Sequence, residues 1–171
     1  MKRGPRATAV GKPGIKLDAR AYALRLIELR PRTIWEIEDQ LAKKGAYKSE
    51  AADIISWLES IGLLNDAKFA RDWIDSRWRL RPMGPTRMRA ELVKKGISRE
   101  IISAALNEFV NNVDQEALAL PLAEKKIRTW RGLEREKIIS RMSGFLARRG
   151  FSAQTINNVL KKVLKGYDDL E

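Results

Sequence analysis

Three times in this chain a leucine stands four residues before a glycine, with two basic residues directly in front of the glycine. The glycines are Gly45, Gly96 and Gly150, which lie 51 and 54 residues apart. A long apolar residue also stands eight positions before each glycine. Positions i and i+4 share one helical face, and a left-handed glycine often ends a helix. The spacing therefore predicts an array of three similar helical units.

The alternative is that this pattern only marks a common kind of helix end. Apolar residues that recur after the glycines argue against it, because they stand six and ten positions after both the second and the third glycine. In the first copy the corresponding pair is Ile54 and Leu58, nine and thirteen positions after Gly45. We therefore expect about three extra residues in the first turn.

The fold class predicted from this repeat is all-α. It is an elongated tandem array of nine helices in three sets of three, because no stretch alternates as a strand does. The first unit is expected over 17–64, the second over 65–111 and the third over 112–171 with a short acidic tail, after a disordered basic arm over 1–16. Units of about 50 residues bury little surface, so the five tryptophans are expected to supply much of the packing.

Polar residues before the apolar stretches predict where helices begin. Asp18, Ser49 and Ser98 are each expected to cap a helix through a side-chain oxygen, and the second unit is expected to open at Asn65 and Asp66. Residues 33–36 read Thr-Ile-Trp-Glu, which is typical of a capping box in which hydroxyl and carboxylate each accept a backbone N–H.

The composition excludes several kinds of chemistry. The chain has no cysteine and no histidine, so thiolate nucleophiles, disulfides and the commonest metal ligand and general base are absent. The sequence contains no phosphate-binding glycine loop and no nucleophile with an evident base. We therefore expect no enzyme activity, no cofactor and no metal. No apolar run is long enough to span a membrane, and a monomer in the cytoplasm is expected.

The net charge of +12 and the isoelectric point near 10.2 point to a polyanionic or strongly acidic partner. The charge is unevenly distributed along the chain. Residues 17–64 carry seven basic and eight acidic residues, whereas 65–111 carry ten and six, and 112–171 carry twelve and eight. Binding to an anion is therefore expected on the second and third units.

Two groups of cations are the candidate binding residues, because guanidinium groups bind phosphate bidentately. The group in the second unit is Arg77, Arg79, Arg81, Arg87, Arg89, Lys94 and Lys95. The group in the third unit is Arg128, Arg131, Arg141, Arg148 and Arg149. The alternative for the second-unit group is an ordinary solvated face with Trp78 in the core, and core burial of Trp78 is favoured over base stacking.

Three motifs resemble the bacterial RecX family of regulatory proteins. Residues 30–37 resemble the family's Arg-x-Arg-Ser-x-x-Glu-Leu, and residues 65–70 resemble its Asp-Asp-x-x-Phe-Ala. Residues 84–97 resemble its Gly-x-x-Arg/Lys-hydrophobic-x-x-Glu-Leu-x-x-Lys-Gly-Ile. The chain departs from these patterns at Thr33, at Asn65 and at Pro85, and Asn65 leaves a carboxylate role at that position in doubt.

The resemblance implies a regulator of the RecA recombinase in DNA repair, homologous recombination and the SOS response. Such a protein would bind in the groove of the RecA–DNA filament and inhibit ATP hydrolysis and strand exchange, and would also bind single- or double-stranded DNA. Two alternatives stay open. One is a general DNA-binding protein that competes for single strands, and the other is a scaffold for an acidic protein.

Overall fold

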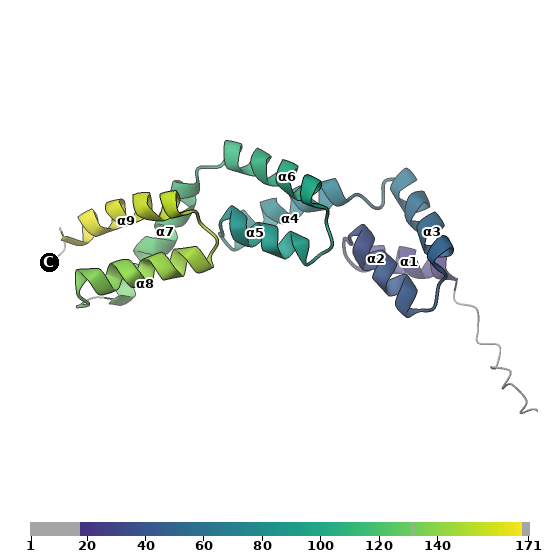
Figure 1. Cartoon of the computed structure of the whole chain (residues 1–171), viewed down its shortest axis with the longest axis horizontal. Helices are drawn as coiled ribbons and strands as arrows, with labels where there is room; N and C mark the ends of the chain where they lie inside the picture. The colour runs from purple at the N-terminus through teal and green to yellow at the C-terminus, as the bar shows by residue number, and fades with distance from the viewer. Residues whose placement is uncertain (1–17, 131, 169–171) are drawn as a thin grey trace, which may run out of the picture.

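The computed structural model describes residues 18–130 and 132–168, and within them it contains nine α-helices, one short 3-10 helix and no strand. The helices follow one another in three sets of three, and the sets lie in a row (Figure 1). Unit 1 contains α1 (Ala19–Leu29), α2 (Ile34–Lys43) and α3 (Lys48–Ser60). Unit 2 contains α4 (Asp66–Leu80), α5 (Pro85–Val93) and α6 (Arg99–Asn112). Unit 3 contains α7 (Gln115–Ile127), η1 (Arg128–Trp130), α8 (Arg135–Arg148) and α9 (Ala153–Asp168).

The predicted all-α array of three-helix units is thereby confirmed. The basic arm predicted over 1–16 lies outside the described residues, as does the end of the acidic tail. The exact unit boundaries stay a prediction.

Each unit has a hydrophobic core of its own, built mainly from aliphatic side chains. The repeated apolar pair before the glycine lies at its centre, because all six side chains are completely buried: Ile37, Leu41, Met88, Leu92, Met142 and Leu146. The tryptophans contribute less than predicted. None of the five is fully buried, and Trp35 is 48% exposed.

The three repeated glycines end helices as predicted. Gly45, Gly96 and Gly150 have φ angles of 86°, 75° and 87°, which is the region that disfavours a Cβ atom. The prediction of extra residues after Gly45 is wrong, because each following helix begins three residues after its glycine. The position that holds isoleucine in units 2 and 3 holds buried Ala51 in unit 1, and this smaller residue hid the correspondence.

Two of the three predicted single-residue caps are confirmed. The side chains of Asp18 and Ser98 accept hydrogen bonds from backbone N–H groups in the first turns of α1 and α6. The structure adds a third cap, because the side chain of Asn65 accepts from the N–H of Lys68 in α4. The prediction for Ser49 is wrong. Ser49 lies inside the first turn of α3, and Tyr47 occupies the cap position without a side-chain hydrogen bond.

Unit 1 joins unit 2 where the start of α2 meets the corner after α5. The hydroxyl of Thr33 donates to the backbone oxygen of Lys95 at 2.7 Å, and the N–H of Ile34 donates to the carboxylate of Asp66 at 2.9 Å. A Cβ atom on Gly96 would lie 2.3 Å from Trp35, so only glycine permits this approach. We call this contact junction 1–2.

The capping box at the start of α2 forms only in part. The N–H of Glu36 donates to the Thr33 hydroxyl as predicted, but the Glu36 carboxylate pairs with Arg30 at 2.9 Å and with Lys95 at 3.0 Å. Burial raises the pKa of Glu36, but the hydrogen bonds from Arg30 and Lys95 outweigh it and hold this pKa below its ordinary value. The carboxylate therefore binds unit 2 to unit 1 instead of capping α2.

Unit 2 joins unit 3 by an equivalent contact, in which the start of α5 meets the corner after α8. The N–H of Gly84 donates to the backbone oxygen of Arg149 at 2.8 Å, and the N–H of Thr86 donates to that of Gly150 at 3.2 Å. The guanidinium of Arg149 donates to the backbone oxygen of Pro82 at 3.1 Å. We call this contact junction 2–3. The repeated glycine corners thus connect the units as well as ending helices.

Asp66 gives junction 1–2 a testable dependence on pH. Burial raises the pKa of Asp66, and the hydrogen bond from Ile34 opposes this effect without cancelling it. A raised pKa means that the folded chain binds this proton more tightly than the unfolded chain. Protonated Asp66 therefore stabilises the folded state fully at a pH below the pKa of this group in the unfolded chain. This stabilisation is lost as the pH rises through the higher pKa of Asp66 in the folded chain.

We expect Asp66→Asn to be at least as stable as the parent protein at pH 7, because the amide oxygen can still accept from Ile34 without a buried charge. Asp66→Ala should lower the free energy of unfolding by about 1–3 kcal/mol, because the N–H of Ile34 loses its acceptor. Urea unfolding measures both changes. Any advantage of Asp66→Asn should disappear when acid protonates Asp66, and an advantage that grows in acid would contradict the assignment.

Candidate nucleic-acid interface

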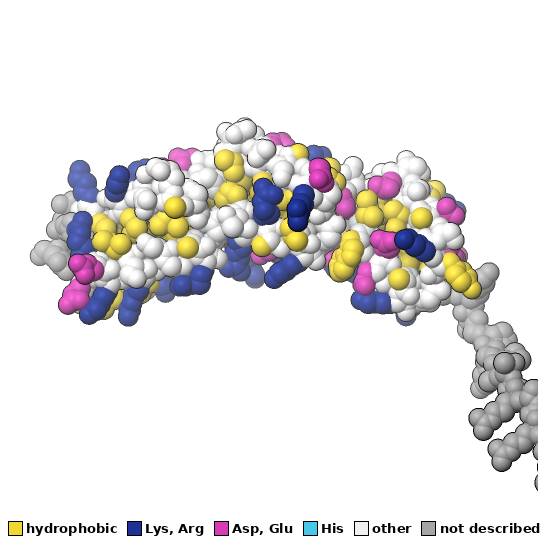
Figure 2. All heavy atoms as spheres, viewed as in Figure 1, with side chains coloured by type: hydrophobic (Ala, Val, Ile, Leu, Met, Phe, Trp, Pro, Cys, Tyr) yellow, Lys and Arg dark blue, Asp and Glu magenta, His cyan; other side chains and the backbone are white. Residues whose placement is uncertain are grey.

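Basic side chains gather along one edge of units 2 and 3. Figure 2 shows this row on the lower edge of the left and central parts of the molecule, over α8 and α5, whereas acidic and apolar side chains dominate the visible face of unit 1. The sequence explains why this cationic face lies over units 2 and 3, because the excess of basic over acidic residues lies after residue 64. The structure then decides which of the predicted cations are available to a ligand.

Several predicted cations in unit 2 are already paired. Arg77 binds the carboxylate of Glu91 at 2.8 Å and lies over the ring of Trp73 at 4.0 Å, and it is only about a quarter exposed. Arg79 pairs with Asp75 at 2.9 Å on the surface of α4. We therefore assign Arg77 a structural role, whereas the exposed pair of Arg79 is weak enough to exchange for a phosphate.

Three further predicted residues belong to the junctions. Lys95 binds Glu36 and lies 4.5 Å from the ring of Trp73, and its side chain is 17% exposed. The Arg149 guanidinium lies at junction 2–3, 5.3 Å from the ring of Phe145. Arg87 donates to the backbone oxygen of Arg148 at 3.3 Å but remains exposed. Lys95 and Arg149 are therefore positioning residues for the array.

The remaining predicted cations are exposed. Arg89 makes one hydrogen bond, at 3.3 Å to the hydroxyl of Ser103. Five exposed cations have no carboxylate partner among the described residues: Arg81, Lys94, Arg128, Arg141 and Arg148. Arg131 lies outside the described residues. Unpaired, solvated cations release counterions when they contact phosphates, so these side chains are the best candidates for binding a nucleic-acid backbone.

A hollow at junction 2–3 brings together predicted cations from both groups. Its volume is about 370 Å³, and its cationic lining residues are Arg87 from α5, Lys94 directly after α5 and Arg148 from α8. Glu91 also lines the hollow. Its Oε2 accepts from Arg77 and from the indole N–H of Trp73, and its Oε1 forms a longer ion pair with Arg87 at 3.8 Å. Three cations around one open hollow suit a phosphate group. Sequence reasoning missed this hollow, because its two walls are 54 residues apart in sequence.

Trp78 does not occupy the core, contrary to the interpretation favoured from the sequence. It is half-buried at the edge of unit 2, its indole N–H donates to Asp75 at 3.0 Å, and Arg79 lies 5.0 Å from its ring. Trp78 therefore packs against the core of unit 2 from its edge.

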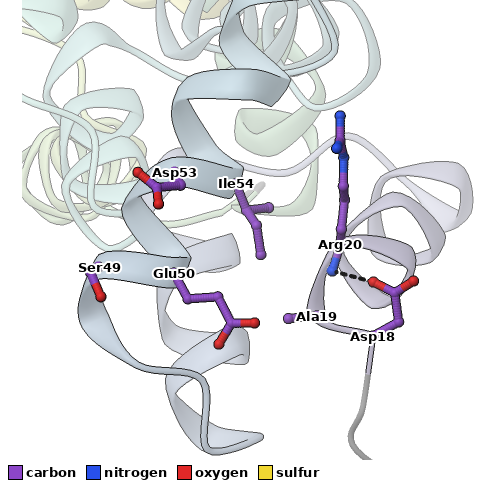
Figure 3. Close-up of a pocket in the computed structure, with 7 residues that line it drawn as sticks. All are labelled: Asp18, Ala19, Arg20, Ser49, Glu50, Asp53 and Ile54. Carbon is purple, nitrogen blue, oxygen red and sulfur yellow. Dashed lines mark hydrogen bonds between the residues drawn. The ribbon is translucent and has the colours of Figure 1, made fainter.

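Unit 1 also has a hollow, but its chemistry differs. Figure 3 shows it between the starts of α1 and α3, where it is lined by Asp18 and Arg20 on one side and by Glu50 and Asp53 on the other. The Asp18 carboxylate caps α1, because it accepts a hydrogen bond from the backbone N–H of Arg20 at 3.1 Å. Three carboxylates and one arginine around this hollow suit a phosphate group less well than the three cations at junction 2–3 do.

Two further findings concern metal ions and membranes, and both apply to the described residues. None of their acidic side chains form a group of three or more that could hold a metal ion. Among the same residues, no helix has the length and apolar character needed to cross a membrane.

The fold and the charge distribution together define a class of protein: an elongated array of three-helix units with a cationic face over two of them. Three family models match the chain in order. They describe the first, second and third three-helix domains of RecX, over residues 19–58, 65–106 and 114–160. The chain belongs to the RecX family.

Individual relatives agree with this assignment. Regulatory protein RecX of Streptomyces lividans is 34% identical over 148 residues, which cover 86% of this chain and 78% of the relative. Regulatory protein RecX of Pelodictyon phaeoclathratiforme is 37% identical over 155 residues, which cover 90% and 94%. The crystal structure of RecX from Lactobacillus salivarius superposes with a TM-score of 0.80, at 24% identity over 85% of this chain and 94% of that one, and so shares its fold.

Proposed function

We propose that this protein binds the filament that the RecA recombinase forms on DNA, and that it inhibits ATP hydrolysis and strand exchange without catalysing a reaction itself. The observation that carries the proposal is the cationic face over α5 and α8, on a body built as a row of units. Membership of a family of regulatory proteins supports the recombinase as the target.

The shape of the protein suits a ligand that is itself extended. A row of units can contact several successive phosphates or protomers along a filament, whereas a single compact domain reaches few. The uneven charge supports a division between the units, because units 2 and 3 attract phosphate and unit 1 is almost neutral. Filling a groove in this way would hinder the movements between protomers that accompany ATP hydrolysis.

The competing explanation is a general DNA-binding protein that removes single strands from the recombinase. The two mechanisms differ in stoichiometry. A filament-directed inhibitor acts at amounts comparable to the recombinase protomers, whereas a competitor must cover the DNA. Competition should also weaken steeply with salt, with a log–log slope of about −0.7 for each phosphate contacted on single strands.

ATP hydrolysis by the cognate recombinase on excess single-stranded DNA tests the proposal. We expect titration with this protein to inhibit hydrolysis well below the amount that covers the DNA. Added free DNA should restore little activity. Inhibition that begins only when the DNA is covered, and that free DNA reverses, would support the competitor instead.

A further inference from the structure

Two of the three glycine corners hold the start of a helix, and the third is open. Gly96 lies against α2 of unit 1, and Gly150 lies against α5 of unit 2. Among the described residues, no atom lies within 4 Å of a Cβ placed on Gly45. The three glycines have similar φ angles, and in each corner the glycine N–H and the next N–H donate to the backbone oxygens three and five residues earlier. The corner at residues 43–47, which we call the free corner, therefore has the backbone pattern of the two docking corners, and no described residue occupies it.

The occupied corners define what such a corner binds. Each presents backbone oxygens at the end of one helix to donors at the start of another, namely the Thr33 hydroxyl in junction 1–2 and the N–H groups of Gly84 and Thr86 in junction 2–3. The negative end of one helix dipole thus meets the positive end of the next. In junction 1–2 a lysine next to the glycine also binds Glu36, three residues after the Thr33 cap.

The free corner carries the same chemistry. Lys44 stands directly before Gly45, as Lys95 does before Gly96, and it is exposed. Its ammonium group lies 5.5 Å from the ring of Tyr22 and has no carboxylate partner among the described residues. A helix that begins with serine or threonine and has glutamate three residues later would satisfy both the corner oxygens and Lys44.

Tyr47 is an independent sign of a partner. Two residues after the other glycines stand Ser98 and Ser152, whose hydroxyls accept backbone N–H groups of the following helices. Tyr47 replaces this serine, caps nothing and is 80% exposed. Tyrosine is enriched in protein interfaces because a large rigid ring contributes contact area at low entropic cost.

A second copy of this chain does not fit the free corner in the same way. The helix start that it would offer is that of α8, which begins at Arg135, seven residues before Met142. In units 1 and 2 the docked helix begins only three residues before the matching apolar residue, at Ile34 and Pro85. The four additional residues extend α8 by about 6 Å, into the space that a corner would occupy.

We propose that the free corner binds the N-terminal turn of an α-helix on a partner protein, with a hydroxyl cap and an acidic residue three positions later. This inference rests on the proposed function, because it names a protomer of the recombinase filament as the partner. Unit 1 then contacts the protein, while units 2 and 3 contact DNA.

The test is Gly45→Asn, because asparagine tolerates the left-handed conformation but projects a side chain into the corner. Gly62→Asn is the matched control. Gly62 has a φ of 73° and open space around it, but it follows α3 and belongs to no docking corner. We expect Gly45→Asn to raise the concentration for half-inhibition of ATP hydrolysis by about 10-fold or more. Its affinity for free single-stranded DNA should equal that of the parent and of Gly62→Asn.

Two more variants keep the proposal falsifiable if Gly45→Asn unfolds. Lys44→Glu should repel the acidic residue of the partner and weaken inhibition. Tyr47→Ser should also weaken inhibition, although it reproduces the serine of the other corners and adds a helix cap. Inhibition at the parent concentration in all three folded variants would overturn the proposal.

Other occupants give distinct results, each of which would also overturn it. If residues 1–16 filled the corner, their deletion would strengthen inhibition in the parent chain but leave Gly45→Asn unaffected. If a second copy filled it, sedimentation would detect self-association that Gly45→Asn abolishes. A parent protein that neither binds nor inhibits the filament would instead contradict the proposed function itself.

Discussion

Gly84→Ala should open junction 2–3 and uncouple unit 3 from unit 2. A Cβ atom on Gly84 would lie 2.2 Å from the backbone oxygen of Gly150, and backbone cannot move aside as the end of a side chain can. The φ angle of Gly84 is −83°, so alanine causes no conformational strain and its effect reports the contact alone. Losing three hydrogen bonds across the junction should cost about 3 kcal/mol.

Hydrogen exchange and denaturation measure this loss. The N–H groups of Gly84 and Thr86 should lose protection while the interior of α5 keeps it, and urea unfolding should separate into two transitions. Gly144→Ala is the matched control, because Gly144 lies within α8 and a Cβ there approaches only the flexible end of Arg148. We expect the control to be neutral or about 0.5–1 kcal/mol more stable. If Gly84→Ala and the parent protein show equal protection from hydrogen exchange, junction 2–3 does not depend on the close contact between Gly84 and the backbone of Gly150.

Replacing Lys94, Arg141 and Arg148 together with alanine should weaken binding to single-stranded DNA on the order of 100-fold at about 0.1 M salt. Each phosphate contact contributes about 0.7 to the log–log slope against salt, so the slope should fall by about 2. These three side chains are exposed and have no described carboxylate partner, so the free energy of unfolding should change little. Binding isotherms at several salt concentrations measure both the affinity and the slope.

A control variant that loses the same number of positive charges in unit 1 distinguishes direct contacts with DNA from a general electrostatic attraction to it. Arg25, Lys43 and Lys48 are exposed cations of unit 1, and replacing them with alanine also removes three positive charges. We expect this control to keep the slope of the parent protein. If both triple variants lose the same affinity, the cationic face over units 2 and 3 is not the binding surface.

The features that could be predicted from the sequence are those that depend only on residues close together in the chain. The pair Met88 and Leu92 must share a helical face because helix geometry places i and i+4 together, whatever surrounds them. A glycine four residues after the second of the pair then ends the helix. The excess charge of units 2 and 3 is likewise a property of segments, and it located the cationic face correctly.

Failures arose where a residue's role depends on a distant neighbour. Arg77 and Arg81 belong to the same basic segment and were predicted to bind alike, yet Arg77 forms an ion pair with Glu91 while Arg81 is exposed. Ser49 is a good capping residue, but the corner places Tyr47 at the start of α3. The fully buried Thr33 was predicted as a local cap, and its hydroxyl also joins two units through Lys95.

The sequence alone thus determined the helices, their grouping into three units and the placement of charge along the row. These follow from periodicity, helix stops and composition, which act over a few residues. The tertiary structure alone decided which cations are available, how the second and third glycine corners join the units and that no described residue fills the first corner. Those features depend on contacts between segments about 50 residues apart, and such contacts leave no pattern within either segment.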